Sequence, residues 1–181
     1  MNANMDWAGN EYRDLISTQS YDAQPPIDGV RIDDLRVFSD EGGDFCEIAR
    51  FGAAALEGWE GYQPEQLSWS WMQPGSIKAW HLHRLQDDLW FVPPRNRLLI
   101  GLLDVREDSE TYRRRMRFTL GAGTAGLLRI PRGVAHGVAN PGTDGASLLY
   151  FANHSFNREQ PDEHRLPWDL LGKEFWSIVP G

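Results

Sequence analysis

Two histidines, His81 and His83, are separated by a single residue in a stretch rich in strand-forming residues. In a β-strand, residues at i and i+2 point to the same side of the sheet, so both imidazoles can reach one shared ligand. Asp87 and Asp88 follow a predicted turn, and a returning strand would bring one carboxylate beside the histidines. Imidazoles and a carboxylate at this spacing could transfer protons or hold a metal ion.

A third histidine, His136, lies in residues 131–140, which read Pro-Arg-Gly-Val-Ala-His-Gly-Val-Ala-Asn. Together with residues 75–83 and the acid after them, this stretch resembles the two sequence motifs of the cupins. In cupins the two motifs meet inside a jelly-roll barrel, so the resemblance implies that these side chains line one cavity. It implies a metal-ligand set suited to Zn, Fe, Mn, Ni or Cu: His81, His83, Asp88 or its neighbour Asp87, and His136.

The elements that must position these residues are short strands. Runs rich in β-branched and aromatic residues alternate with Gly, Pro, Asp and Asn, which is typical of an all-β barrel or sandwich. We predict strands at residues 30–38, 45–51, 66–72, 76–83, 89–92, 98–105, 115–120, 126–130, 135–139 and 146–152. Only residues 53–57 and the tail after Trp168 resemble helices. The predicted fold is an all-β cupin jelly-roll barrel with short helical or irregular terminal segments.

A closer resemblance covers most of the chain. Residues 130–137, Ile-Pro-Arg-Gly-Val-Ala-His-Gly, and residues 148–150, Leu-Leu-Tyr, are similar to segments of the 3,5-epimerases that act on dTDP-4-keto-6-deoxy sugars. Residues 38–45 resemble that family's Phe-x-Asp-x-Arg-Gly-x-Phe, residues 78–81 its Arg-Gly-Leu-His strand, and residues 163–169 its acidic segment ending in Trp-x-Asp. The family is built on the cupin barrel and requires no metal.

The resemblance implies a reaction in which a proton leaves the carbon next to a C4 ketone and returns on the other face. Such a reaction needs a base, an acid and a group that holds the enolate oxygen. The implied roles are base for His81, acid for Tyr150, orientation of the base for Asp169, and substrate binding for Lys78, His83 and His136.

Two positions depart from the family pattern. The lysine that lies near the developing oxyanion falls at Asp88, and the arginine that contacts substrate phosphate is replaced by Gly42. A carboxylate repels the negative charge that a lysine attracts. A divalent cation in the ligand set above would polarise the carbonyl in place of the lysine. A metal-bound histidine cannot also accept a proton, which would pass the role of base to Tyr150 or His154.

Structural interpretations stand beside these functional ones. His81 and His83 could line the barrel and bond neighbouring hydroxyls, Tyr150 could be a core aromatic, and the tryptophans are first of all core mass. The sugar 3,4-ketoisomerases use a similar His-x-His pair on the same scaffold, but the Ala-His-Gly segment at His136 favours the epimerases. Because His136 lies in a motif of its own, a functional pocket is favoured over a purely structural role for the histidines.

Length and charge limit the remaining possibilities. The chain has 181 residues, which fits one domain, expected at residues 29–181 after an N-terminal arm of residues 1–28. A net charge of −8 argues against binding to nucleic acid, and no apolar run approaches the roughly 18 residues of a membrane helix. A single cysteine, Cys46, and the absence of a visible secretory signal favour a cytoplasmic location. The resemblance implies a homodimer.

Three functions stay open at this level. The first is an epimerase or isomerase acting on a nucleotide-linked 4-keto-6-deoxy sugar or a related small molecule, without a required cofactor. The second is a metal-dependent cupin enzyme acting on another small molecule. The third is a cupin that binds a sugar or nucleotide without catalysis.

Overall fold

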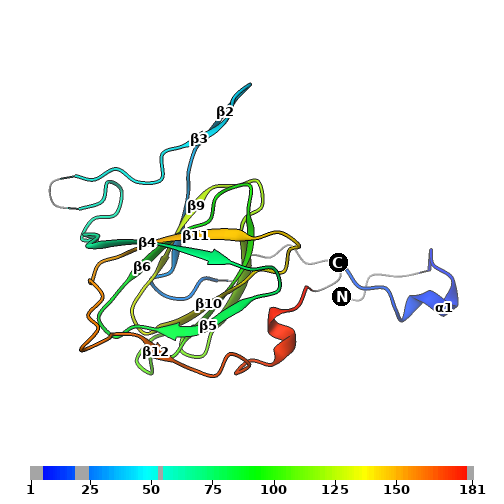
Figure 1. The fold of residues 1–181 in the computed structure, drawn as a ribbon. Coiled ribbons are helices and arrows are strands. Elements are labelled where there is room, and N and C mark those ends of the chain that lie inside the picture. The colour runs from blue at the N-terminus through cyan, green and yellow to red at the C-terminus, as the bar shows by residue number, and fades with distance from the viewer. Residues whose placement is uncertain (1–5, 19–24, 53–54, 179–181) are drawn as a thin grey trace.

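The computed structural model of the chain describes residues 6–18, 25–52 and 55–178. Two five-stranded antiparallel sheets face each other, and a two-stranded hairpin projects from them (Figure 1). The strands of the first sheet, in spatial order, are β1 (Arg31–Asp34), β9 (Gly126–Ile130), β6 (Asp88–Phe91), β11 (Ala146–Ala152) and β4 (Gln66–Met72). Those of the second are β12 (His164–Arg165), β5 (Ile77–Leu82), β10 (Val134–Ala139), β7 (Arg97–Asp104) and β8 (Arg115–Gly121).

This architecture confirms the predicted all-β jelly-roll fold. The strand predictions hold closely from residue 66 onward, where alternation and turn residues are clearest. The first predicted strand, residues 30–38, is in fact two strands, β1 and β2 (Val37–Asp40). The second is shorter and earlier than expected, because β3 (Gly43–Cys46) turns back on β2 to form the projecting hairpin. The single strand predicted at residues 30–38 therefore hid a change of sheet.

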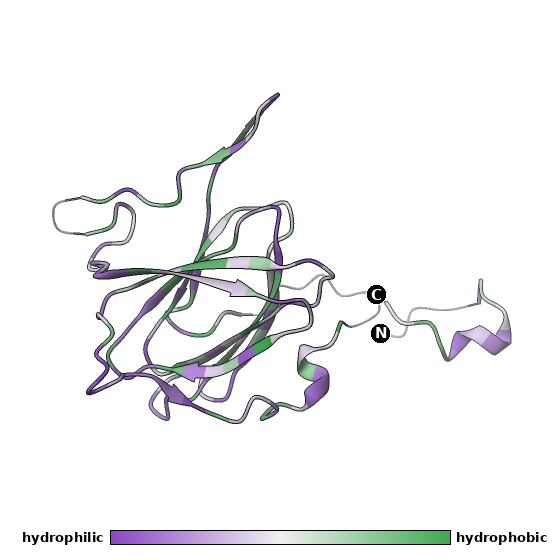
Figure 2. Ribbon diagram, viewed as in Figure 1, coloured by the Kyte–Doolittle hydropathy of each residue, from purple (hydrophilic) through white to green (hydrophobic). Residues whose placement is uncertain are grey.

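Helices contribute little to the described part of the chain. Helix α1 (Asn10–Arg13) buries no residue and is largely hydrophilic (Figure 2). The first two residues of the predicted helix 53–57 lie outside the described residues, and the rest of that segment is not helical. The predicted C-terminal helix is a short 3-10 turn, η1 (Lys173–Trp176). No helix among the described residues is long and apolar enough to cross a membrane.

The main core lies between the two sheets and combines apolar side chains from both of them. It begins at Ile27, which is fully buried, two residues before the expected start of the domain. Trp90 and Leu148 from one sheet pack with Ile100 and Val138 from the other in this cluster. Trp90, Val138 and Leu148 of this core also line the cavity described below.

The aromatic stripe of β4 faces outward, contrary to our expectation that its tryptophans are core mass. Trp69 is 64% exposed and Trp71 46%, whereas Ser68 and Ser70 on the other face are half-buried. The alternation predicted a strand correctly, but it could not tell which face is inside. The small polar face of β4 therefore points towards the interior, where it leaves room for a polar cavity.

The C-terminal turn η1 covers the outer face of the second sheet. Trp80 on β5 is fully buried, and its ring centroid lies 5.4 Å from that of Phe175 and 5.0 Å from that of Trp176. A Cβ at Gly101 or Gly137 would fall within 3 Å of the Trp176 ring, so only glycine allows the turn to approach these strands. This packing fixes the strands that carry the histidines.

Candidate active site

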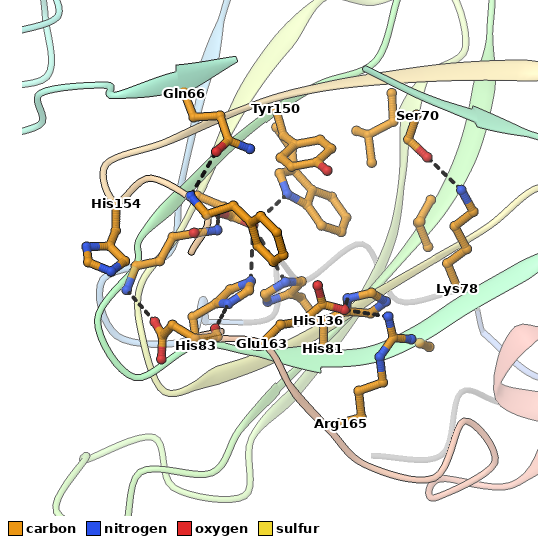
Figure 3. A pocket seen from close by; sticks show the side chains of 18 of the residues that line it. Gln66, Ser70, Lys78, His81, His83, His136, Tyr150, His154, Glu163 and Arg165 are labelled. Atoms are coloured by element: carbon orange, nitrogen blue, oxygen red, sulfur yellow. Dashed lines mark hydrogen bonds and ion pairs between the residues drawn. The ribbon is translucent and has the colours of Figure 1, made fainter. Parts of the chain in front are cut away.

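A cavity of about 560 Å³ opens between the two sheets. β5 and β10 line it on one side, and β4, β6 and β11 line it on the other (Figure 3). All three histidines singled out from the sequence, together with Asp88, Tyr150 and Lys78, are among its lining residues. The structure thus brings the predicted site residues to one cavity, with the exception of Asp169.

His81 lies on β5 opposite His136 on the neighbouring strand β10. Its Nδ1 is 3.2 Å from the Oε1 of Glu163, and the same carboxylate is paired with Arg165. Burial, followed by the nearby guanidinium of Arg165, lowers the pKa of His81, which favours the neutral ring at pH 7. Because Nδ1 faces Glu163, Nε2 is the ring nitrogen left for a substrate.

Glu163 occupies the place we expected Asp169 to fill. Asp169 is exposed and does not line the cavity. Glu163 directly precedes β12, whose residue Arg165 pairs with His81 across the edge of β5. This docking carries the glutamate to the histidine, and no local pattern in the sequence indicates which acid of residues 162–169 makes the contact.

His83, Asp88 and His136 form a second group, deeper in the cavity. Asp88 Oδ2 is 3.9 Å from His83 Nε2 and 3.6 Å from His136 Nε2, and one potential ligand atom from each residue lies within 4.8 Å of the others. Gln86 Nε2 and Trp90 Nε1 donate to the Asp88 carboxylate at 2.5 Å and 3.1 Å.

Burial shapes the charges of this group. His136 and Asp88 are each 3% exposed. Burial, with the nearby His83, lowers the pKa of His136 to about 3 and so keeps its ring neutral. Burial also raises the pKa of Asp88. The group contains three of the four expected metal ligands, and the fourth, His81, is paired with Glu163 instead.

Asp87 and Asp88 point in opposite directions, as neighbours on a strand do. Asp87 is bound by Arg129 at 2.8 Å and Arg132 at 3.0 Å. Although burial opposes ionisation, hydrogen bonds from these two guanidiniums lower the pKa of Asp87. The structure thus resolves which of the two acids faces the histidines: it is Asp88.

Tyr150 and Lys78 complete the predicted set. Tyr150 is half-buried on β11, the strand between β6 and β4, and so faces the cavity from the sheet opposite His81. Lys78 is exposed at the rim, where its Nζ donates to Ser70 Oγ at 2.7 Å. Figure 3 shows both residues beside the histidine group.

Asp162 is a further residue that sequence reasoning missed. Its carboxylate accepts hydrogen bonds from the backbone N–H groups of Arg84, Leu85 and Gln86, and its carbonyl oxygen accepts one from His83 Nδ1. Asp162 therefore fixes the β5–β6 turn and orients His83. Its neighbour Glu163 orients His81, so one short segment positions two of the three histidines.

A sequence model of dTDP-4-dehydrorhamnose 3,5-epimerase matches residues 24–170 of the chain. The chain belongs to this epimerase family. It is 43% identical over 143 residues to the spore coat polysaccharide biosynthesis protein SpsL of Bacillus subtilis, covering 79% of this chain and 91% of that protein. It is 33% identical over 147 residues to the probable low-salt glycan biosynthesis epimerase Agl13 of Haloferax volcanii, covering 80% and 90%.

Solved structures of the epimerase family have the same fold. A dTDP sugar isomerase from Desulfovibrio desulfuricans G20 superposes with a TM-score of 0.70 at 27% identity, covering 84% of this chain and 91% of that one. NovW, a 4-keto-6-deoxy sugar epimerase from Streptomyces spheroides, has a TM-score of 0.71 at 20% identity, covering 86% and 78%, and shows the fold alone. The expected epimerase-like isomerase is confirmed, in a family that works without a cofactor.

Proposed function

We propose that this chain epimerises a nucleotide-linked 4-keto-6-deoxy sugar by moving protons at the carbons next to the C4 ketone. The observation that carries the proposal is the His81–Glu163 pair on one sheet with Tyr150 on the opposite sheet of the same cavity. A base and an acid on opposite walls can act on opposite faces of one sugar ring, which is what inversion at a carbon requires.

In the proposed reaction one proton leaves a carbon of the sugar and another is added to the same carbon. Nε2 of His81 takes the proton from C3 or C5, and the C–H electron pair forms the enolate with negative charge on the C4 oxygen. The Tyr150 hydroxyl then gives its proton to the same carbon from the other face, and the enolate electrons form the new C–H bond. His81 then releases its added proton to solvent, and solvent replaces the proton that Tyr150 has lost. Glu163 stabilises the imidazolium during this cycle.

The sugar's nucleotide part is assigned to the rim of the cavity. Lys78 is exposed there and offers an ammonium group to a diphosphate. Two solved structures bear on the class of ligand: an epimerase from Bacillus anthracis holds TDP, and ChmJ from Streptomyces bikiniensis holds dTDP-quinovose. These ligands belong to those proteins, and they support the same class for this chain.

The proposal includes a homodimer. β4 is the edge strand of its sheet, and its outward face exposes three large apolar side chains in a row: Leu67, Trp69 and Trp71. An exposed apolar edge strand invites pairing with another strand, and a second copy of this chain offers the same surface. A cytoplasmic location is proposed with it, since a lone cysteine can form no intrachain disulfide.

Incubation with dTDP-4-keto-6-deoxyglucose in deuterium oxide tests the catalytic proposal. We expect the wild-type protein to introduce deuterium into the sugar at C3, C5 or both. Mass spectrometry and proton NMR detect this exchange. The His81→Asn variant should lose this exchange, by about 10²–10⁴-fold. His164→Asn removes an exposed imidazole on β12, 3.6 Å from Asp162, and controls for the effect of disturbing this segment alone. Wild-type protein that binds the nucleotide sugar but exchanges no proton would overturn the proposal.

A further inference from the structure

Three lone pairs converge in the deep part of the cavity. His136 Nδ1 is 3.0 Å from the carbonyl oxygen of Val134, and His83 Nδ1 is bonded to that of Asp162. Because a carbonyl oxygen only accepts, each Nδ1 must carry a proton, so Nε2 is the ring nitrogen that can present a lone pair. Both Nε2 atoms face the same carboxylate oxygen of Asp88.

The distances between these atoms are longer than a hydrogen bond. A charged imidazolium would donate to a carboxylate at about 2.7–2.9 Å, whereas the two separations here are 3.6 Å and 3.9 Å. Two ligands at roughly 2.1 Å from a shared tetrahedral cation lie about 3.4 Å apart. The spacing therefore leaves room for an ion among the three atoms.

Among the residues that the structure describes, no lysine or arginine is paired with the buried carboxylate of Asp88. Its hydrogen bonds come from Gln86 and Trp90, which are neutral. The neighbouring carboxylate of Asp87 provides a comparison, because it is equally buried but is bound by two arginines. Burying an unpaired carboxylate is costly, and the usual remedies are a paired cation, a bound metal or a proton.

We propose that His83, Asp88 and His136 bind one divalent transition-metal ion, and that His81 is not a ligand. Two imidazoles whose other nitrogens are tied to backbone carbonyls, with one carboxylate, make a ligand set with pre-oriented rings and remaining coordination positions towards the cavity. Zn²⁺, Mn²⁺, Fe²⁺, Co²⁺ and Ni²⁺ share this chemistry.

The role of the ion rests on the proposed epimerase function. An enolate oxygen in the cavity needs a positive charge, and the cationic side chains Lys78 and Arg165 lie exposed near the rim. A cation beside the C4 carbonyl would neutralise that oxygen. Since Glu163 holds His81 apart from the three ligands, the base stays free to accept a proton.

Metal binding is measured without any sugar. Full-length protein is treated with a chelator, dialysed against Zn²⁺, Co²⁺ or Mn²⁺, and its metal content determined by mass spectrometry. We expect about one ion per chain, with visible Co²⁺ absorption bands typical of nitrogen and oxygen ligands. His83→Ala, His136→Ala and Asp88→Asn should each weaken binding at least about 10-fold. His154→Ala, which removes an imidazole from the same cavity, and His81→Asn should leave binding unchanged.

NMR of the wild-type protein gives a second readout of metal binding. On addition of Zn²⁺, ¹⁵N NMR should show shifts at Nε2 of two histidine rings, and His81→Asn should retain both. The proposed site would be overturned if the protein bound no stoichiometric ion at millimolar metal, or if Asp88→Asn bound the metal as tightly as wild type. A proton shared among the three side chains would then be the occupant. Binding without proton exchange on the sugar would overturn the epimerase proposal alone and favour a metal-dependent enzyme for another small molecule.

Discussion

The carboxylate of Glu163 lies 3.2 Å from Nδ1 of His81, although 82 positions separate the two residues in the chain. The contact exists because β12 adds to the open edge of β5, which places the residue before β12 beside the histidine. The carboxylate fixes the ring so that Nε2 faces the cavity, and it stabilises the positive charge that the ring gains on accepting a proton.

Glu163→Gln should therefore slow catalysis without weakening substrate binding. The amide keeps a hydrogen-bond partner for the ring but removes the charge that stabilises the imidazolium, so we expect kcat to fall roughly 10²-fold with KM little changed. Steady-state kinetics measures both constants. Asp169→Asn, an exposed acid outside the cavity, is the control. Equal loss in the two variants would mean that the pairing with His81 has no catalytic role.

Tyr150→Phe should separate the two proton transfers. With the base intact, the proton at C3 or C5 still leaves and returns on the His81 side, so deuterium enters the substrate with its configuration retained. Formation of the epimer should fall about 10²–10⁴-fold because the opposite face has no acid. NMR distinguishes the labelled substrate from the epimer, and Tyr112→Phe serves as control. Normal epimer formation by Tyr150→Phe would assign the acid to another residue.

Asp104 anchors a buried network whose effect on stability depends on pH. Its carboxylate accepts hydrogen bonds from Arg106 at 2.9 Å, Ser109 at 2.6 Å and Thr111 at 2.6 Å. Although burial opposes ionisation, these bonds lower the pKa of Asp104 well below its usual value. A lowered folded-state pKa stabilises the fold above the unfolded pKa of about 3.9, and this contribution is lost as pH falls towards the lowered value.

We expect Asp104→Asn to reduce the free energy of unfolding by about 2–4 kcal/mol at pH 7, with the difference from wild type shrinking below about pH 4. Urea unfolding at several pH values measures this. Asp108→Asn, an exposed acid in the same turn, should change stability by less than about 0.5 kcal/mol. A difference that does not vary with pH would show that the charge of Asp104 is not the cause.

Gly137→Ala tests the packing behind the site. The new Cβ would lie 2.4 Å from that of Ala79 and 2.9 Å from the Trp176 ring, so β5 or the turn η1 must move. Overpacking of this kind costs about 1–3 kcal/mol, and the adjacent His136 would move with the strand. The thermal unfolding temperature and the affinity for the metal should both fall. Gly42→Ala, whose new Cβ meets only the Asp40 side chain, should change neither.

Trp69→Asp with Trp71→Asp tests the proposed homodimer. Charges on the exposed face of the edge strand oppose its pairing with a second copy, so sedimentation should show a shift from dimer to monomer at micromolar concentration. Trp7→Asp, at an exposed tryptophan outside the sheets, is the control. A dimer that persists in the double variant would place the interface elsewhere.

The sequence by itself determined the fold class and most of the strands. Turn residues and alternating apolar positions are local features, and they mark strands 66–72 and 146–152 without reference to the rest of the chain. The two histidine motifs also indicated a shared cavity, because His81 and His136 each lie in a recognisable segment. Those same motifs predicted His81 and Asp88 as members of one ligand set.

Only the tertiary structure decided which of these residues contact one another. Strand order puts β12 beside β5, which pairs His81 with Glu163 rather than with Asp169, and register turns Asp88 inward while Asp87 meets two arginines. It also turns the Trp69 face of β4 outward. The physical reason is that the alternation of side chains along a strand defines two faces but not which face is buried. Residues far apart in the chain meet only when their strands pair in the folded protein.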